Sequence, residues 1–97
     1  MASPTELTPL VFLHAFPLDG SMWKEANRFS DRQTLAPDFP GFGAHPAAAP
    51  NLDDFADAVA EAMDNAAISR AVLVGLSMGG YVAFRFHARY PERVAGL

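Results

Sequence analysis

The chain has 97 residues, of which 51% are hydrophobic, with a formal net charge of −4 and no cysteine. This length suits one small globular domain at most, and the acidic balance argues against nucleic acid or an anionic membrane as a partner. The missing cysteine excludes disulfides, and with no secretory signal or membrane-spanning apolar run visible, we expect a cytoplasmic protein without a membrane partner.

The first predicted elements are a buried strand and a short helix. Residues 9–14 form a continuous apolar run, which is typical of a strand buried on both faces of a parallel sheet. A loop follows over residues 15–20. Asp19 or Ser21 is able to cap a short helix over about residues 22–29.

A second, shorter strand is predicted over residues 33–36, followed by a loop over residues 37–46 that is dense in proline and glycine. Asn51 is placed to cap a helix over about residues 52–66. Apolar residues recur along this helix at three- and four-residue spacing and form its buried face: Leu52, Phe55, Ala56, Val59, Ala60 and Met63. Acidic residues form a stripe that we expect to be solvated rather than to bind a metal: Asp53, Asp54, Asp57, Glu61 and Asp64.

The last third of the chain alternates strand and helix again. Residues 70–74 are a short apolar run with valines, residues 81–90 have helical length and an apolar stripe, and residues 94–97 begin another strand. This alternation predicts a parallel sheet with crossover helices. Because a parallel sheet needs both faces covered and its edge protected, we expect these residues to be one part of a larger domain.

The stretch between the third strand and its helix, Gly75-Leu76-Ser77-Met78-Gly79-Gly80, carries the strongest chemical signal. Gly-x-Ser-x-Gly between a strand and a helix is the signature of a nucleophile elbow. Such an abrupt turn holds its central residue in a sparsely populated backbone conformation, and Gly75 and Gly79 remove the clash that a Cβ would make. Ser77 is left at the tip, with the helix-opening N–H groups, Met78 first, aimed at whatever it attacks.

The same turn allows a different interpretation. It could be the glycine-rich turn of any doubly wound protein, with Ser77 acting as a helix cap. Phosphate binding is disfavoured, because no Gly-Lys-Ser or Gly-Lys-Thr ending is present and Gly41-Phe42-Gly43 lacks a third glycine at dinucleotide spacing. The strand before the turn and the helix after it favour the interpretation of Ser77 as a nucleophile.

A second motif, His14-Ala15-Phe16-Pro17, follows the first strand. With the elbow, it makes essentially the whole chain resemble the amino-terminal half of an α/β-hydrolase-fold enzyme. Residues 38–43 (Asp-Phe-Pro-Gly-Phe-Gly) and 90–94 (Tyr-Pro-Glu-Arg-Val) are similar to further stretches of this family. The resemblance implies a three-layer α/β/α fold with a mostly parallel sheet, of which residues 1–97 are the amino-terminal portion of a single domain.

Within the family, the elbow together with Pro-Leu-Asp-Gly-Ser-Met-Trp at residues 17–23 is similar to the enol-lactonase, carboxylesterase and non-haem haloperoxidase branches. Serine at the elbow excludes branches that use aspartate there, such as haloalkane dehalogenases and epoxide hydrolases. Ala15 departs from the family pattern, which usually has glycine at this position, so its Cβ restricts the backbone of the oxyanion loop.

The resemblance implies nucleophilic acyl transfer on a small carboxylic ester or lactone, with no cofactor and no metal. Ser77 attacks the carbonyl, an acyl-enzyme forms, and water releases it. By position in the family motifs, the backbone N–H groups of Phe16 and Met78 form the oxyanion hole. Pro17 disfavours a helical conformation at Phe16, so that this N–H stays free to face the site. Trp23 is a candidate lining residue of the substrate pocket.

The base that such a serine needs is missing from the chain. In this family the acid and then the histidine follow the nucleophile, but the residues after Ser77 contain no plausible pair. The resemblance makes His14 structural, His45 lies in the proline- and glycine-rich loop, and His87 is roughly 15 Å along the helix from the elbow. Asp38 is better explained as a hydrogen-bonding loop residue than as the triad acid. We therefore expect the 97 residues alone to be inactive.

Three functions remain open from the sequence. The first is a serine hydrolase whose acid and base come from a following segment or a companion chain. The second is a non-catalytic protein of the same fold that binds a small molecule. The third is an inert fragment that needs a complementary chain. A continuation with Asp or Glu after a later strand and then His in a later loop would favour the enzyme.

Overall fold

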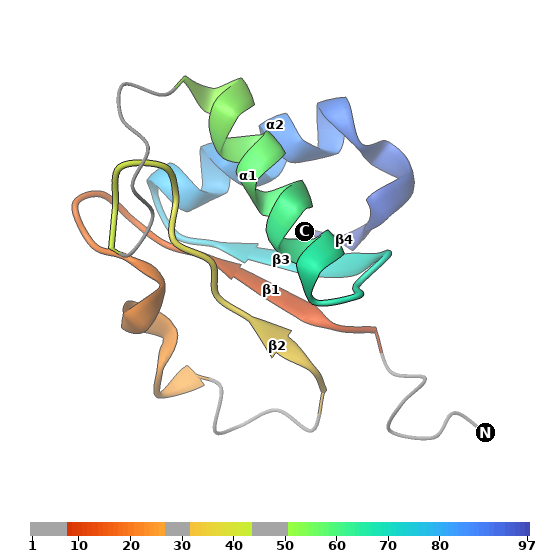
Figure 1. Ribbon diagram of the computed structural model, residues 1–97, viewed down its shortest axis with the longest axis horizontal. Helices are drawn as coiled ribbons and strands as arrows, with labels where there is room; N and C mark the ends of the chain where they lie inside the picture. The colour runs from red at the N-terminus through yellow and green to blue at the C-terminus, as the bar shows by residue number, and fades with distance from the viewer. Residues whose placement is uncertain (1–7, 27–31, 44–50) are drawn as a thin grey trace.

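The computed structural model describes residues 8–26, 32–43 and 51–97. Within these residues the chain forms a four-stranded sheet in the order β2-β1-β3-β4 (Figure 1). The strands are β1 (Leu10–Leu13), β2 (Thr34–Leu35), β3 (Ala71–Gly75) and β4 (Val94–Gly96). The helices are α1 (Leu52–Asn65) and α2 (Met78–Arg89), and the 3-10 turns are η2 (Gly20–Trp23) and η4 (Pro91–Arg93).

All three strand pairings are parallel, which confirms the sheet expected from the alternation of strands and helices. β1 lies beside β3, with Leu10 opposite Val72 and Leu13 opposite Gly75. Both strands therefore end at the same edge of the sheet. In open α/β sheets this carboxyl edge is where ligands bind.

The hydrophobic core lies between the sheet and the two α-helices. Val11 and Leu13 of β1 are fully buried and form one cluster with residues of α1, β3 and α2, including Phe55, Val59, Met63, Leu73, Val82 and Phe86. Phe12 points to the opposite face because side chains alternate along a strand. Its ring stacks on Trp23 of η2, with the ring centroids 5.1 Å apart. Among the helices of the described residues, none has the length and apolarity needed to cross a membrane.

The start of α1 confirms the prediction made for Asn51. Its side chain accepts a hydrogen bond from the Asp54 N–H at 2.8 Å, and the Asp54 carboxylate accepts one from the Asn51 N–H at 3.1 Å. This reciprocal pair is a capping box, which satisfies two N–H groups at the helix start. The start of α1 was therefore encoded locally.

The short helix expected over about residues 22–29 is not present in its described part. Residues Gly20–Trp23 instead form the 3-10 turn η2, capped by Asp19, one of the two caps expected, and residues 27–29 lie outside the described residues. The Gly20 N–H donates to the Asp38 carboxylate at 2.7 Å, and a Cβ on Gly20 would lie 2.1 Å from the Ala36 carbonyl oxygen. The turn is thus packed tightly against a distant loop, and this contact outweighs the local preference for a helix.

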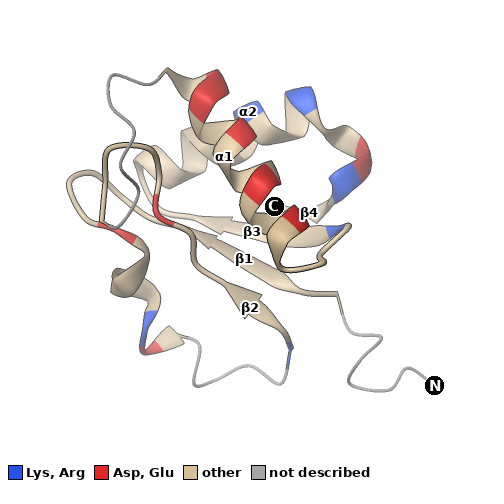
Figure 2. Ribbon diagram, viewed as in Figure 1, with Lys and Arg blue, Asp and Glu red and all other residues tan. Residues whose placement is uncertain are grey.

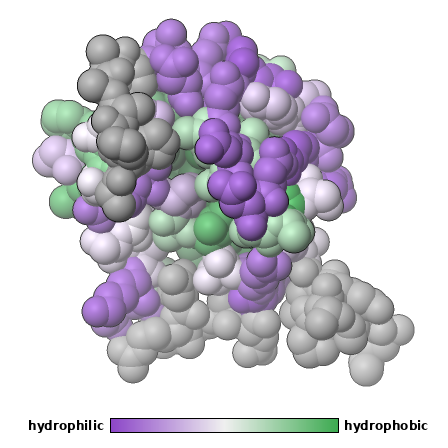
Figure 3. Space-filling view, viewed as in Figure 1, coloured by the Kyte–Doolittle hydropathy of each residue, from purple (hydrophilic) through white to green (hydrophobic). Residues whose placement is uncertain are grey.

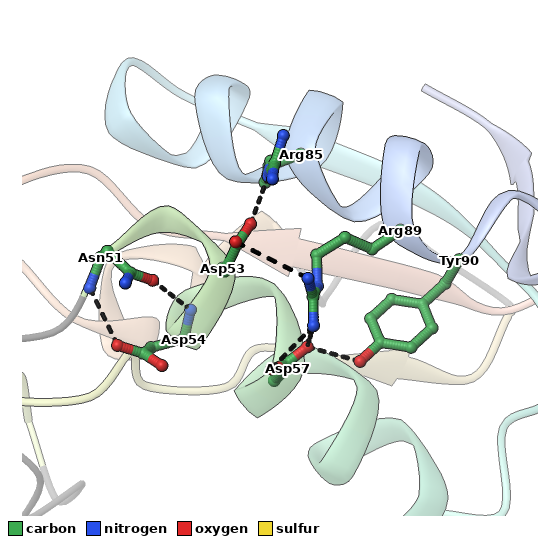
Figure 4. A network of polar contacts seen from close by, with 7 residues as sticks. All are labelled: Asn51, Asp53, Asp54, Asp57, Arg85, Arg89 and Tyr90. Carbon is green, nitrogen blue, oxygen red and sulfur yellow. Dashed lines mark hydrogen bonds and ion pairs between the residues drawn. The ribbon is translucent and has the colours of Figure 1, made fainter.

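The acidic stripe of α1 is exposed or partly exposed, and part of it also forms ion pairs with α2. Arg85 and Arg89 of α2 form ion pairs with Asp53 and Asp57 of α1 (Figures 2 and 4). Arg89 Nη2 lies 2.8 Å and 3.1 Å from the two Asp57 carboxylate oxygens, and the Tyr90 hydroxyl donates to the same carboxylate. Figure 3 shows hydrophilic side chains gathered over α1 and α2. The stripe is therefore accessible to solvent, as expected, and one-turn spacing on both helices also brings two of its carboxylates opposite arginines, which the sequence analysis did not predict.

These contacts lower the pKa of both aspartates. For Asp53 the main cause is the hydrogen bond from Arg85, and for Asp57 it is the hydrogen bond from Tyr90, to which Arg89 adds. A carboxyl group whose pKa is lower in the folded state contributes stability above its unfolded pKa, near 3.9 for Asp. That contribution is lost as the pH falls through the folded pKa.

We predict that Asp57→Asn lowers the free energy of unfolding at pH 7 by up to about 1 kcal/mol, because the pair is exposed and partly screened by solvent. The variant should also lose less stability than the parent chain between pH 5 and pH 3. Urea unfolding at several pH values measures both effects. Glu61→Gln is the matched control, since Glu61 lies on the same helix and forms no ion pair with another described residue. Equal effects of the two substitutions would contradict the role of the pairing.

Candidate active site

The paired ends of β1 and β3 bring the two sequence motifs together. Since Leu13 lies opposite Gly75, residues 14–16 and residues 76–78 leave the sheet side by side. The Leu76 N–H donates to the Leu13 carbonyl at 3.3 Å, which continues the contact beyond the strands. Two segments far apart in the sequence thus meet at the carboxyl edge.

Ser77 occupies the turn between β3 and α2 in a strained conformation. Its φ is 55° and its ψ is −114°, and α2 begins at the next residue. A non-glycine residue in such a region costs roughly 1–3 kcal/mol, and such residues cluster at functional sites. Ser77 is exposed, and its side chain forms no capping hydrogen bond to the helix. The alternative in which Ser77 serves as a helix cap therefore has no contact to support it.

Gly75 and Gly79 sit where the backbones touch. A Cβ on Gly75 would lie 2.5 Å from the Gly79 carbonyl carbon, and a Cβ on Gly79 would lie 2.1 Å from the Leu13 carbonyl oxygen. Real Cβ atoms essentially never come this close to backbone atoms, so both positions require glycine. Gly80, one residue later, has open space at the same position. The two glycines of the motif are thus distinguished from their neighbour by geometry.

Two backbone N–H groups in the segments that follow β1 and β3 have no hydrogen-bond acceptor among the described residues, those of Phe16 and Met78. The following amides of α2 are satisfied, since Gly79 donates to the Leu76 carbonyl and Gly80 to the Ser77 carbonyl, both at 2.9 Å. Free N–H groups at a helix start favour an anionic oxygen. The amides proposed from the sequence are therefore available to a ligand.

The rings around this edge are only partly buried. Phe16 is 68% exposed and meets Phe42 edge-on, with ring centroids 5.8 Å apart, and its peptide bond to Pro17 is cis. Trp23 is half-buried on the other face of the sheet, against Phe12. Its Nε1 is buried and has no hydrogen-bond partner among the described residues. Its place in a substrate pocket stays a prediction.

No described histidine is free to act as the base for Ser77. His14 is fully buried, with Nδ1 3.1 Å from the Ala15 carbonyl oxygen and Nε2 accepting the Phe39 N–H at 3.0 Å. His87 is exposed on α2, well beyond the elbow, and His45 lies outside the described residues. Among the described residues, no group of three or more His, Cys, Asp and Glu side chains is placed to hold a metal.

Asp38 is a hydrogen-bonding loop residue, as expected, since its carboxylate accepts the Gly20 N–H. Two other contacts around the site were missed by sequence reasoning. Besides the link from His14 to Phe39, the Ala15 N–H donates to the Met22 sulfur at 3.2 Å. Neither contact has a local sequence signal, because both join residues brought together only by the fold.

Comparison with known protein families shows to which family the chain belongs. Residues 10–97 match the model of the alpha/beta hydrolase family. The chain belongs to this family. Both the fold class and the resemblance predicted from the sequence are thereby confirmed.

The relatives of this alpha/beta hydrolase chain include several esterases. It is 36% identical over 89 residues to the pimeloyl-[acyl-carrier protein] methyl ester esterase of Shewanella woodyi, covering 91% of this chain and 33% of the relative. A thermophilic esterase from Thermogutta terrifontis matches with a TM-score of 0.87 and 36% identity, over 94% of this chain and 35% of that one. Est816, described as an N-acyl homoserine lactone degrading enzyme, matches with a TM-score of 0.82 and 32% identity, over 93% and 36%. The chain thus spans about a third of the length of these relatives.

We predict opposite effects for alanine at the two neighbouring glycines of α2. Gly79→Ala should lower the free energy of unfolding by about 1–3 kcal/mol, because its Cβ forces the helix away from the end of β1. Gly80→Ala should raise it by about 0.5–1 kcal/mol, because alanine is favoured over glycine inside a helix and has room there. Urea unfolding of both variants measures the difference. Equal stabilities would contradict the backbone contact at Gly79.

Proposed function

We propose that this chain is the amino-terminal part of a serine hydrolase that cleaves a small carboxylic ester or lactone. The observation that carries the proposal is Ser77 itself, exposed at positive φ and followed by the unsatisfied Met78 amide, at the sheet edge where β1 also ends. A family whose matched members include esterases and a lactone-degrading enzyme supports the same reaction class. The cost of the strained turn is then explained by the exposure of its hydroxyl.

In the proposed reaction, the Ser77 hydroxyl oxygen attacks the carbonyl carbon, and its proton passes to a base. The carbonyl oxygen becomes an oxyanion that accepts hydrogen bonds from the Phe16 and Met78 N–H groups. Each such donor contributes roughly 10²–10³ in turnover in well-studied enzymes. Collapse of the intermediate releases the alcohol, which takes up the proton, and leaves an acyl group on Ser77. Water then releases the acid by the same steps in reverse order.

We further propose that the acid and the base lie outside these 97 residues, in a following segment or a companion chain. His14 supports this, because both of its ring nitrogens are occupied by the backbone. The length of the relatives leaves ample sequence for the missing residues. In this proposal residues 1–97 are the amino-terminal portion of a single hydrolase domain, and its substrate is a small molecule.

We predict that the 97-residue chain does not hydrolyse p-nitrophenyl acetate above the uncatalysed rate, whereas the full-length protein does. Loss of the base in a comparable serine enzyme lowers turnover by about 10⁶-fold, so we expect no measurable activity from the 97 residues alone. Ser77→Ala in the full-length protein should abolish turnover, and Ser69→Ala, an exposed serine away from the elbow, should leave it unchanged.

Two outcomes would contradict the proposal. Turnover by the 97-residue chain that is lost on Ser77→Ala would show that the base lies within it. Full activity of the Ser77→Ala full-length protein would remove the nucleophile from its assigned role.

A further inference from the structure

The loop that carries the Phe16 amide is held by a buried imidazole. His14 is fully buried, and its Nε2 accepts a hydrogen bond from the Phe39 N–H at 3.0 Å. An amide N–H can only donate, so Nε2 must keep its lone pair. The ring proton then lies on Nδ1 and is donated to the Ala15 carbonyl oxygen, 3.1 Å away. The surroundings therefore select one neutral tautomer.

The bond to Ala15 acts on the neighbouring amide through the geometry of the peptide unit. The Ala15 carbonyl and the Phe16 N–H belong to one planar trans peptide group, in which they point in opposite directions. The Ala15 oxygen also accepts the Leu18 N–H at 2.8 Å. With two donors holding the oxygen on one side, the Phe16 N–H is directed to the other side.

The peptide group before it is also fixed, since the Ala15 N–H donates to the Met22 sulfur at 3.2 Å. The imidazole itself is held by packing. Its ring centroid lies 4.2 Å from that of Phe39 and 5.5 Å from that of Phe42. A ring flip would lose the hydrogen bond to Phe39, and a displaced ring would lose the ring contacts as well.

We propose that His14 is a positioning residue that orients the Phe16 N–H through the Ala15 carbonyl. The orientation is a property of the fold, and its use as an oxyanion donor rests on the proposed function. His14 does not touch the reacting atoms in this proposal. It acts by fixing the Ala15 carbonyl oxygen, which points away from the Phe16 N–H within the same planar peptide group.

The test compares two substitutions that each keep one of the two hydrogen bonds made by the imidazole. His14→Asn places a side-chain N–H near the Nδ1 position and keeps a donor for the Ala15 carbonyl. His14→Gln places its amide near the Nε2 position, where it can accept the Phe39 N–H, and loses the donor to Ala15. Both remove the aromatic ring from the core and both lower stability, so unfolding measurements alone do not separate them.

The readout is the residual dipolar coupling of the Phe16 N–H in the partially aligned full-length protein, fitted against the amides of β1, β3 and α2. We expect the coupling in His14→Asn to equal that of the parent chain. In His14→Gln we expect it to differ from the parent value. An unchanged coupling in the Gln variant, or equal changes in both variants, would overturn the proposal.

The parent chain provides a second measurement in case neither variant folds. The ¹⁵N spectrum of its imidazoles should show His14 protonated at Nδ1 and bare at Nε2. A proton at Nε2 would overturn the proposal, because the Ala15 carbonyl would then lack its donor. Neither measurement depends on Ser77, so a failure here is distinct from a failure of the proposed function, which the turnover of the Ser77→Ala full-length protein tests.

Discussion

The direct contact between the first turn of α2 and the end of β1 is the constraint on which the site depends. A Cβ on Gly79 would lie 2.1 Å from the Leu13 carbonyl oxygen, so no side chain separates the two backbones. This contact places the start of α2 against the segment that continues into residues 14–16. The sharp turn at Ser77, with its positive φ, lies directly between β3 and this contact.

The rest of the described chain keeps that contact in place. α2 packs on the sheet through the hydrophobic core. It is also joined to α1 by ion pairs of Arg85 with Asp53 and of Arg89 with Asp57. On the other side of the elbow, His14 and Met22 fix the two peptide groups that lead to Phe16. Packed elements and hydrogen bonds thus hold the two segments that carry Ser77 and Phe16, which is what the proposed site would require.

Much of this could be predicted from the sequence, because it is written in local patterns. The capping box at Asn51 and the Gly-x-Ser-x-Gly turn involve residues within a few positions of each other. The link from His14 to Phe39 could not be predicted, since it spans 25 positions and needs the folded sheet. Ala67, at the end of α1, has a φ of 57° where glycine is usual, so the sequence holds no signal for that turn.

The most direct test of the account is a crystal structure of the full-length protein after reaction with a fluorophosphonate. The account predicts a covalent bond between Ser77 Oγ and phosphorus, with the phosphoryl oxygen about 3 Å from both the Phe16 and Met78 nitrogens. An unmodified Ser77, or a phosphoryl oxygen directed away from these two amides, would contradict it.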